Sequence, residues 1–141
     1  MDWIGLRAVR RAGICAVTTA DVTADGLAGD HAPPGKRAVT LIQAEHLPVI
    51  AALCDGAATP EALRRNIVVS GINLASLRKR DMAVGDAVLH IVGPCPPCSR
   101  MEETLGPGGY QAVRGHGGWY AEVVAPGAVA VGDAVRPGEA A

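Results

Sequence analysis

The sequence predicts a single domain that is mainly β, either an all-β barrel or a sandwich, and three observations support this. Its 141 residues are about the usual length of one domain. Hydrophobic residues make up 49% but aromatic residues only 3%, with no Phe, so the core must consist of Val, Ile, Leu and Ala. The 18 Gly and 10 Pro that interrupt these apolar runs are typical of short strands joined by tight turns.

The elements follow in chain order from short apolar runs and the turn-forming residues between them. Strands are predicted at residues 3–9, 14–19, 37–43 and 67–69, and within 82–93 and 119–137. Residues 43–55 (QAEHLPVIAALCD) have apolar side chains at helical spacing, and residues 59–66 (TPEALRRN) open with the residue types of an N-cap and first turn. One or two short helices are therefore expected, and residues 21–36, which lack any period, are predicted to be a loop throughout.

Two turns and one basic segment complete the prediction. The tripeptide VGD occurs at Val84–Asp86 and again at Val131–Asp133, each time before a short apolar run. Because Gly permits positive φ and Asp tolerates turn geometry, each VGD is predicted to be a turn that leads into a strand. The basic segment Leu77–Arg80 (LRKR) is predicted to be a solvated turn before the strand at Met82.

The overall charge narrows the classes of partner. The net charge is -1 and the pI is near 6.4, whereas nucleic-acid and membrane-surface proteins carry a clustered excess of Lys and Arg. The sequence shows neither a long apolar span nor the sections of a signal peptide. We therefore expect a cytoplasmic protein that binds neither nucleic acid nor membrane, in which thiols stay reduced.

The stretch IVGPCPPCSRM, residues 91–101, carries the clearest chemical signal. Two cysteines at C-x-x-C spacing can form half of a zinc site, a disulfide, a redox dithiol or a reactive thiol, or can simply fill space. Zinc would need a second pair of ligands, and Cys15 and Cys54 stand alone in apolar runs, where we expect them in the core. Three prolines stiffen the loop and Arg100 follows Cys98, so a reactive thiol at Cys95 or Cys98 is favoured.

Two other segments offer anion-binding groups. LRRNIVV places two arginines and an asparagine at the start of a buried strand, where Arg can provide a forked donor for phosphate or carboxylate. VRGHGG combines Arg114 and His116 with glycines, and it fits an anion-binding turn or an ordinary hairpin turn. Asp30 and His31 form a further polar pair on the long loop.

Taken together, four segments resemble the MOSC domain, named for the C-terminal domain of molybdenum cofactor sulfurase, in its small stand-alone form. They are GLAGDHAPPGKRAVTLIQAEHL, LRRNIVVSGINLASL, VGDAVLHIVGPCPPCSRMEE and RGHGGWYAEVVAPGAVAVGDAVRP. The resemblance covers about residues 26–137 of a single domain spanning 1–141. It implies a closed, mainly antiparallel β-barrel and a role in sulfur transfer or in binding the molybdenum cofactor, molybdopterin.

The resemblance also implies roles for individual residues. Cys98 would accept a persulfide or ligate molybdenum through its thiolate, and Cys95 is the second candidate. Arg64 and Asn66 are similar to the family residues that hold the phosphate and ring of the pterin. Further cofactor contacts would come from three residues, Arg114, Arg100 and His116.

The resemblance has consequences for partners as well. The chain shows no pyridoxal-phosphate cysteine desulfurase domain and no additional N-terminal β-barrel domain of the larger relatives. A separate sulfur donor, such as a cysteine desulfurase, and a molybdoenzyme acceptor are therefore implied. The leading hypothesis is a sulfur-carrying or cofactor-binding protein, with enzymatic activity favoured. Two alternatives stay open: a non-catalytic zinc-stabilised module, and a molybdenum-dependent reductase of N-hydroxylated compounds.

Overall fold

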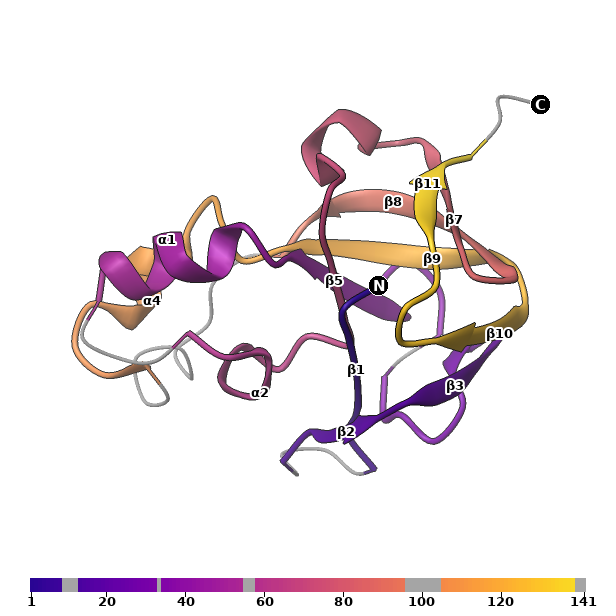
Figure 1. Cartoon of the computed structure of the whole chain (residues 1–141), viewed down its shortest axis with the longest axis horizontal. Coiled ribbons are helices and arrows are strands. Elements are labelled where there is room, and N and C mark those ends of the chain that lie inside the picture. The colour runs from indigo at the N-terminus through magenta and orange to yellow at the C-terminus, as the bar shows by residue number, and fades with distance from the viewer. Residues whose placement is uncertain (9–12, 33, 55–57, 96–104, 139–141) are drawn as a thin grey trace.

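The computed structural model describes residues 1–8, 13–32, 34–54, 58–95 and 105–138. Short strands dominate this part of the chain, with three short α-helices and one 3-10 helix between them (Figure 1). The elements are β1 (Trp3–Leu6), β2 (Cys15–Val17), β3 (Thr19–Thr23), β4 (Gly26–Leu27), β5 (Val39–Gln43), α1 (His46–Ala52), α2 (Pro60–Leu63), β6 (Ile67–Val69), η1 (Leu74–Leu77), β7 (Asp81–Val84), β8 (Ala87–Pro94), α4 (Gly109–Val113), β9 (Trp119–Ala125), β10 (Gly127–Ala130) and β11 (Val135–Pro137). The predicted mainly β class is confirmed.

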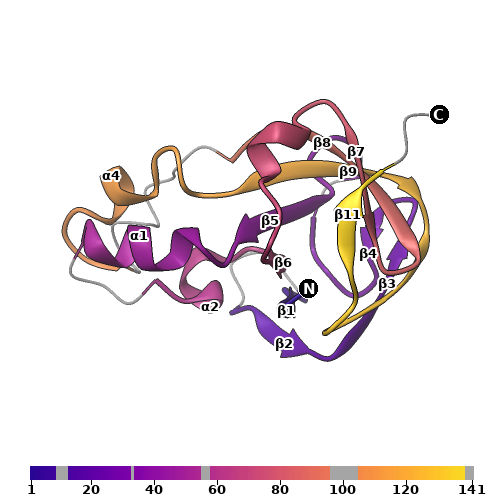
Figure 2. The same cartoon turned by 45° about the horizontal axis from the view of Figure 1, so that its top comes forward.

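The strands form two strongly curved sheets. The larger sheet has eight strands in the order β11-β7-β8-β9-β5-β6-β1-β2, and the smaller has three in the order β10-β3-β4. Within the described ladders every neighbouring pair is antiparallel except β5 and β6, which run parallel. Turning the molecule shows the strands wrapping around a common interior while the helices gather to one side (Figure 2).

Backbone hydrogen bonds also join the two sheets. The N–H of Asp86, between β7 and β8, donates to the carbonyl of Ala128 in β10 at 3.1 Å. The N–H of Gly132, after β10, donates to the carbonyl of Met1, before β1, at 2.8 Å. In the described part of the chain these contacts do not complete a ladder that closes either sheet on itself. Closure of the barrel therefore stays a prediction.

Two apolar clusters stabilise the molecule, one on each face of the central strands. Inside the curved sheets lie buried side chains such as Leu41, Ile67 and Val69. Ile42 and Val68 point to the opposite face, where they pack with buried residues of the three α-helices and with Leu105. Strands β5 and β6 are covered on both faces, so every residue of both strands is buried, including the polar Thr40 and Gln43, and neither strand alternates between buried and exposed residues.

Several sequence predictions are confirmed. Strands occur within each predicted range, and helices α1 and α2 lie within the two predicted helical segments. Both VGD tripeptides are turns between strands, with φ of +54° at Gly85 and +98° at Gly132. Arg78 to Arg80 are exposed and lie in the turn before β7, as expected, whereas Leu77 of the same predicted turn ends η1 and is buried.

Other predictions were wrong. The predicted loop at 21–36 contains most of β3 and all of β4, because Val22 and Leu27 turn inward and are 3% and 4% exposed. Cys15 is exposed because β2 is an edge strand of the larger sheet, and Cys54 is only partly buried. The segment VRGHGG, residues 113–118, connects helix α4 to β9 and does not join two strands, so the interpretation as a hairpin turn was wrong.

Candidate functional site

Cys95 lies directly after β8, at the edge of the larger sheet that faces the helices. Its backbone N–H donates a hydrogen bond to the carbonyl of Gly118 at 2.8 Å, which fixes it to the segment entering β9. The residue is 5% exposed. Burial raises the pKa of the Cys95 thiol from 9.0 to about 11, while the guanidinium groups of Arg65 and Arg37 act in the opposite direction. At neutral pH the group is a protonated thiol, which must lose its proton before it can attack sulfur or bind a metal.

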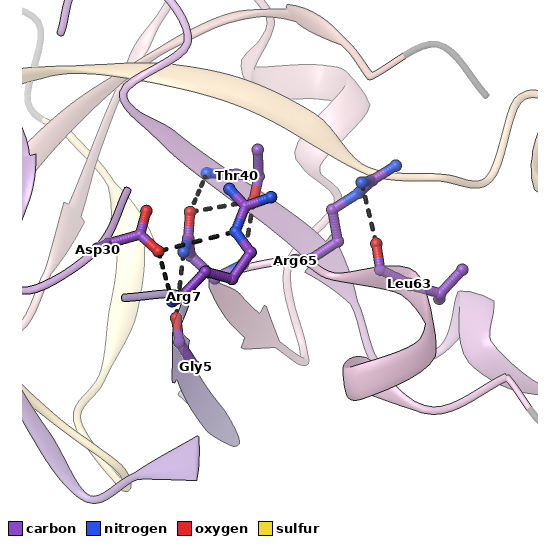
Figure 3. A network of polar contacts seen from close by, with 7 residues as sticks. Gly5, Arg7, Asp30, Thr40, Leu63 and Arg65 are labelled. Carbon is purple, nitrogen blue, oxygen red and sulfur yellow. Dashed lines mark hydrogen bonds and ion pairs between the residues drawn. The ribbon is translucent and has the colours of Figure 1, made fainter. Parts of the chain in front are cut away.

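Arg65 is the buried cation beside this thiol. It is 8% exposed and lies immediately before Asn66 and β6. Its Nε donates to the carbonyl of Gly117 at 2.6 Å. Its Nη1 donates to the carbonyl of Leu63 at 3.0 Å, the bond drawn in Figure 3. These bonds satisfy two backbone carbonyls and hold a permanent positive charge at the carboxyl end of β8.

Arg37 provides the second charge from the segment that precedes β5. Its guanidinium carbon lies 4.7 Å from the centroid of the Tyr120 ring, a cation–π contact. Tyr120 pairs with Gly93 near the end of β8, so this exposed arginine is held close to Cys95 by the sheet register.

Asn66, a predicted cofactor contact, is fully buried in the sheet. Its Oδ1 accepts hydrogen bonds from the backbone N–H and the hydroxyl of Thr40, both at 3.1 Å, and its Nδ2 donates to the carbonyl of Gly5 at 3.1 Å. The side chain therefore connects β1, β5 and the start of β6. In this conformation it is 0% exposed and positions the neighbouring Arg65.

Arg64, also predicted, terminates helix α2 in an unusual conformation. Its φ of +57° is left-handed, and its N–H donates to the carbonyls of Pro60 and Glu61. A non-glycine residue in this region is uncommon and strained by about 1–2 kcal/mol. Strain of this kind is often retained at functional sites.

Arg114 and His116 occupy the connection from α4 to β9. Arg114 is exposed, whereas His116 is partly buried and packs edge-to-face on His46, with ring centroids 5.7 Å apart. His116 precedes Gly117, the residue that Arg65 holds. We call Cys95, Arg65 and Arg37 the thiol–arginine cluster. His116 lies next to this cluster in the chain, whereas Arg114 is exposed three residues before Gly117.

Cys98 and Arg100 lie outside the described residues. The structure therefore places Cys95 but not Cys98, the cysteine that the resemblance favours. A reading of the sequence missed two residues of the cluster, Arg65 and Arg37. The motif LRRN contained the signal for Arg65, since it holds two adjacent arginines, but nothing in the sequence distinguishes the buried one. Arg37 carries no motif, because its role follows from the pairing of distant strands.

Within the described ranges, no group of three or more His, Cys, Asp or Glu side chains could hold a metal ion. The same part of the chain contains no helix long and apolar enough to cross a membrane.

Comparisons with known proteins agree with this architecture. The sequence model of the MOSC domain matches residues 17–136. YuaD from Bacillus subtilis has a similar structure, with a TM-score of 0.81 and 20% identity over 95% of this chain and 92% of that one. YiiM from Escherichia coli gives a TM-score of 0.73 and 20% identity, covering 100% of this chain and 71% of that one. YiiM from Geobacillus stearothermophilus gives a TM-score of 0.79 and 18% identity, covering 97% of this chain and 73% of that one. The comparison with curated proteins finds no match.

The fold and the site define a small, mainly β domain that holds a cysteine beside two arginines at a strand end. The chain belongs to the MOSC domain family. Members of this family are generally linked to the binding or sulfuration of the molybdenum cofactor.

Proposed function

We propose that this domain carries sulfur, or binds a molybdopterin-type cofactor, through a cysteine of the loop that follows β8. The observation that supports the proposal best is the position of the Cys95 thiol beside the guanidinium groups of Arg65 and Arg37. A thiol next to fixed positive charge can ionise when a sulfur donor or soft metal approaches. Cys98, three residues further along the sequence, is the other candidate for the reactive thiol.

Sulfur transfer requires only thiol–disulfide chemistry. The thiolate of the domain would attack the outer sulfur of a donor persulfide, so that one S–S bond breaks and another forms. The proton lost from the cysteine would neutralise the donor thiolate that leaves, and no oxidant or reductant is needed. Arg65 stabilises the thiolate during this step because its charge is held in place by Gly117 and Leu63.

The residues present also fit a molybdopterin-type cofactor. A cysteine thiolate suits molybdenum as a soft ligand, and guanidinium groups suit the phosphate of the pterin. Cys95 or Cys98 would hold the metal, while Arg64, Arg37 and Arg114 would contact the phosphate. When bound, the cofactor would supply a redox-active metal centre. Asn66 would act by positioning Arg64 and Arg65, since its own polar atoms already have protein partners.

Native mass spectrometry tests the proposal. The wild-type protein is incubated with a small-molecule persulfide donor, or with molybdenum cofactor, and is compared with Cys95→Ser, Cys98→Ser and the double variant. We expect a gain of one sulfur atom or of the cofactor mass that is lost in one single variant and in the double variant. Cys15→Ser is the matched control, because Cys15 is exposed on β2, away from the thiol–arginine cluster. A bound zinc ion with no other adduct would instead support a zinc-stabilised module.

A further inference from the structure

The segment Arg78–Arg80, which we call the basic turn, is an exposed cluster of charge that the proposed function does not use. All three side chains, Arg78, Lys79 and Arg80, are exposed. Of the ion pairs in the described part of the chain, none involves the basic turn: the neighbouring Asp81 pairs with His90 at 2.8 Å. Three adjacent like charges without a carboxylate partner repel one another, so packing does not explain their presence.

The backbone of the basic turn is strained at its central residue. Lys79 has a φ of +61°, a left-handed conformation that Gly adopts at little cost and a lysine does not. Its N–H donates to the carbonyl of Ile91 at 2.7 Å, so the turn is held tightly against β8. Only two non-glycine residues in the described ranges have positive φ, Lys79 and Arg64, and both are cations. Strain that persists at a charged residue indicates that the charge has a use.

The basic turn lies close to the thiol. Ile91 exchanges backbone hydrogen bonds with Lys79 and Arg80, and Cys95 is four residues further along the chain. At a strand rise of about 3.3 Å per residue this separation is roughly 13 Å. Arg37 lies on the other side of β8, over Tyr120. Cations therefore flank the end of β8 on both sides.

Acidic residues gather elsewhere, around Ala128 in strand β10. Asp21 in β3 lies opposite Ala128 in the neighbouring strand β10. The N–H of Asp86 donates to the carbonyl of Ala128 at 3.1 Å. The Asp133 carboxylate accepts from the N–H of Ala130 at 2.8 Å. Two further carboxylates, Asp81 and Glu122, lie near the basic turn. The three exposed cations of the turn outnumber them, so the local field attracts negatively charged partners.

We propose that the basic turn docks an acidic surface of the protein that exchanges sulfur with this domain, an inference that rests on the proposed function. A protein interface of ordinary size buries about 800 Å² on each partner, which is wide enough to cover both the turn and Cys95. Three cations on a chain of net charge -1 are few for a nucleic acid, whose binding depends on neutralising many phosphates. A local acidic patch on a protein fits the charge and the dimensions better.

Sulfur transfer from two short synthetic peptides tests the inference. Both carry one cysteine persulfide, flanked by glutamates in the acidic peptide and by glutamines in the neutral one. We expect transfer at low salt to be about tenfold faster from the acidic peptide, with the advantage lost at high salt and in the variant Arg78→Glu/Lys79→Glu/Arg80→Glu. Equal rates from the two peptides would overturn the docking proposal alone. Absence of transfer from both peptides would instead overturn sulfur transfer, the part of the proposed function on which this inference rests.

Lys79→Gly separates a docking role from a structural one. The substitution removes the left-handed strain, so we expect a higher melting temperature together with slower transfer from the acidic peptide. A lower melting temperature and an unchanged rate would show that Lys79 is structural and would contradict the inference. Asp86→Asn, at the acidic end, should leave the acidic peptide's advantage in place. Inhibition by a single-stranded RNA oligomer that matched inhibition by excess acidic peptide would also overturn the assignment to a protein partner.

Discussion

The Nε atom of Arg65 lies 2.6 Å from the carbonyl oxygen of Gly117, and this hydrogen bond joins the start of β6 to the entry of β9. The same guanidinium group lowers the pKa of Cys95 against the larger effect of burial. One side chain therefore has two functions, because it satisfies a backbone carbonyl and maintains positive charge beside the thiol. The two functions can be separated by substitution.

Arg65→Ala should destabilise the domain and make the Cys95 thiol less reactive. Loss of the side chain leaves the carbonyls of Gly117 and Leu63 without their donor, which we expect to cost about 2–3 kcal/mol of unfolding free energy in urea denaturation. The pKa of Cys95 should rise further, so alkylation of this thiol should slow at a given pH. Arg37→Ala is the control: it should also slow alkylation, while stability changes by about 1 kcal/mol or less because Arg37 is exposed. Equal stability losses in the two variants would contradict this assignment.

The raised pKa of Cys95 predicts a specific loss of stability in alkali. In the unfolded chain the thiol ionises near its ordinary pKa of 9.0, whereas in the folded protein it stays protonated until about 11. Between these values the folded state holds more protons than the unfolded state, so unfolding free energy falls as pH rises. At pH 11 the loss should reach about 2 kcal/mol, from about 1.4 kcal/mol per unit of pKa difference.

Denaturant unfolding of the wild type and Cys95→Ala across this pH range measures that loss. The alanine variant has no thiol to ionise at this position, so its unfolding free energy should decline less steeply above pH 9. Parallel declines in the two proteins would show that Cys95 is solvated and ionises normally in the folded state.

Gly118, directly before β9, should tolerate almost no substitution. Gly118 has a φ of +96°, and a Cβ at this position would collide with the carbonyl of Leu41 in the neighbouring strand β5. We expect Gly118→Ala to cost more than about 3 kcal/mol, measured by thermal or urea denaturation. Gly115→Ala is the matched control, because Gly115 also has positive φ, +83°, but open space around it. Its cost should be only about 1–2 kcal/mol, the price of the left-handed backbone.

Most of the strands could be predicted from the sequence because the pattern of apolar residues within one strand can be recognised without knowing its neighbours in the sheet. Residues 67–69 are a continuous apolar run and residues 37–43 are mostly apolar, and both segments contain strands covered on two faces. Helix α4 was missed because its sequence, GYQAV among glycines, has weak helix propensity. It is stabilised by tertiary packing of Ala112 and Val113, which no local pattern shows.

The site was predictable only at the level of motifs. LRRN identified the correct segment, but the sequence could not show which arginine would be buried. Helix α2 ends with Arg64 in a left-handed conformation, and the next residue, Arg65, is the one whose guanidinium group is buried beside Cys95. Arg37 reaches the site through the pairing of β5 with β9, which is a property of the whole sheet.

Asp30 provides a last prediction, because its buried carboxylate is only partly satisfied. Oδ1 accepts the backbone N–H of Arg7 at 2.8 Å and lies 3.8 Å from Arg7 Nε, while the side chain is 0% exposed (Figure 3). In the described part of the chain, neither Oδ2 nor Arg7 Nε has a hydrogen-bond partner.

Asp30→Ala removes both the hydrogen bond and the negative charge, so it should cost about 2–4 kcal/mol, since it leaves the Arg7 N–H unsatisfied and the guanidinium without a counter-charge. Asp30→Asn keeps an oxygen acceptor for the Arg7 N–H and should cost less. Arg7→Met, which removes the cation but keeps an apolar chain of similar length, leaves the carboxylate alone in the interior and should cost at least as much as Asp30→Asn. Additive effects in the double variant Asp30→Asn/Arg7→Met would show that the two charges do not interact, because a coupled pair should lose less in combination than the sum of its single losses.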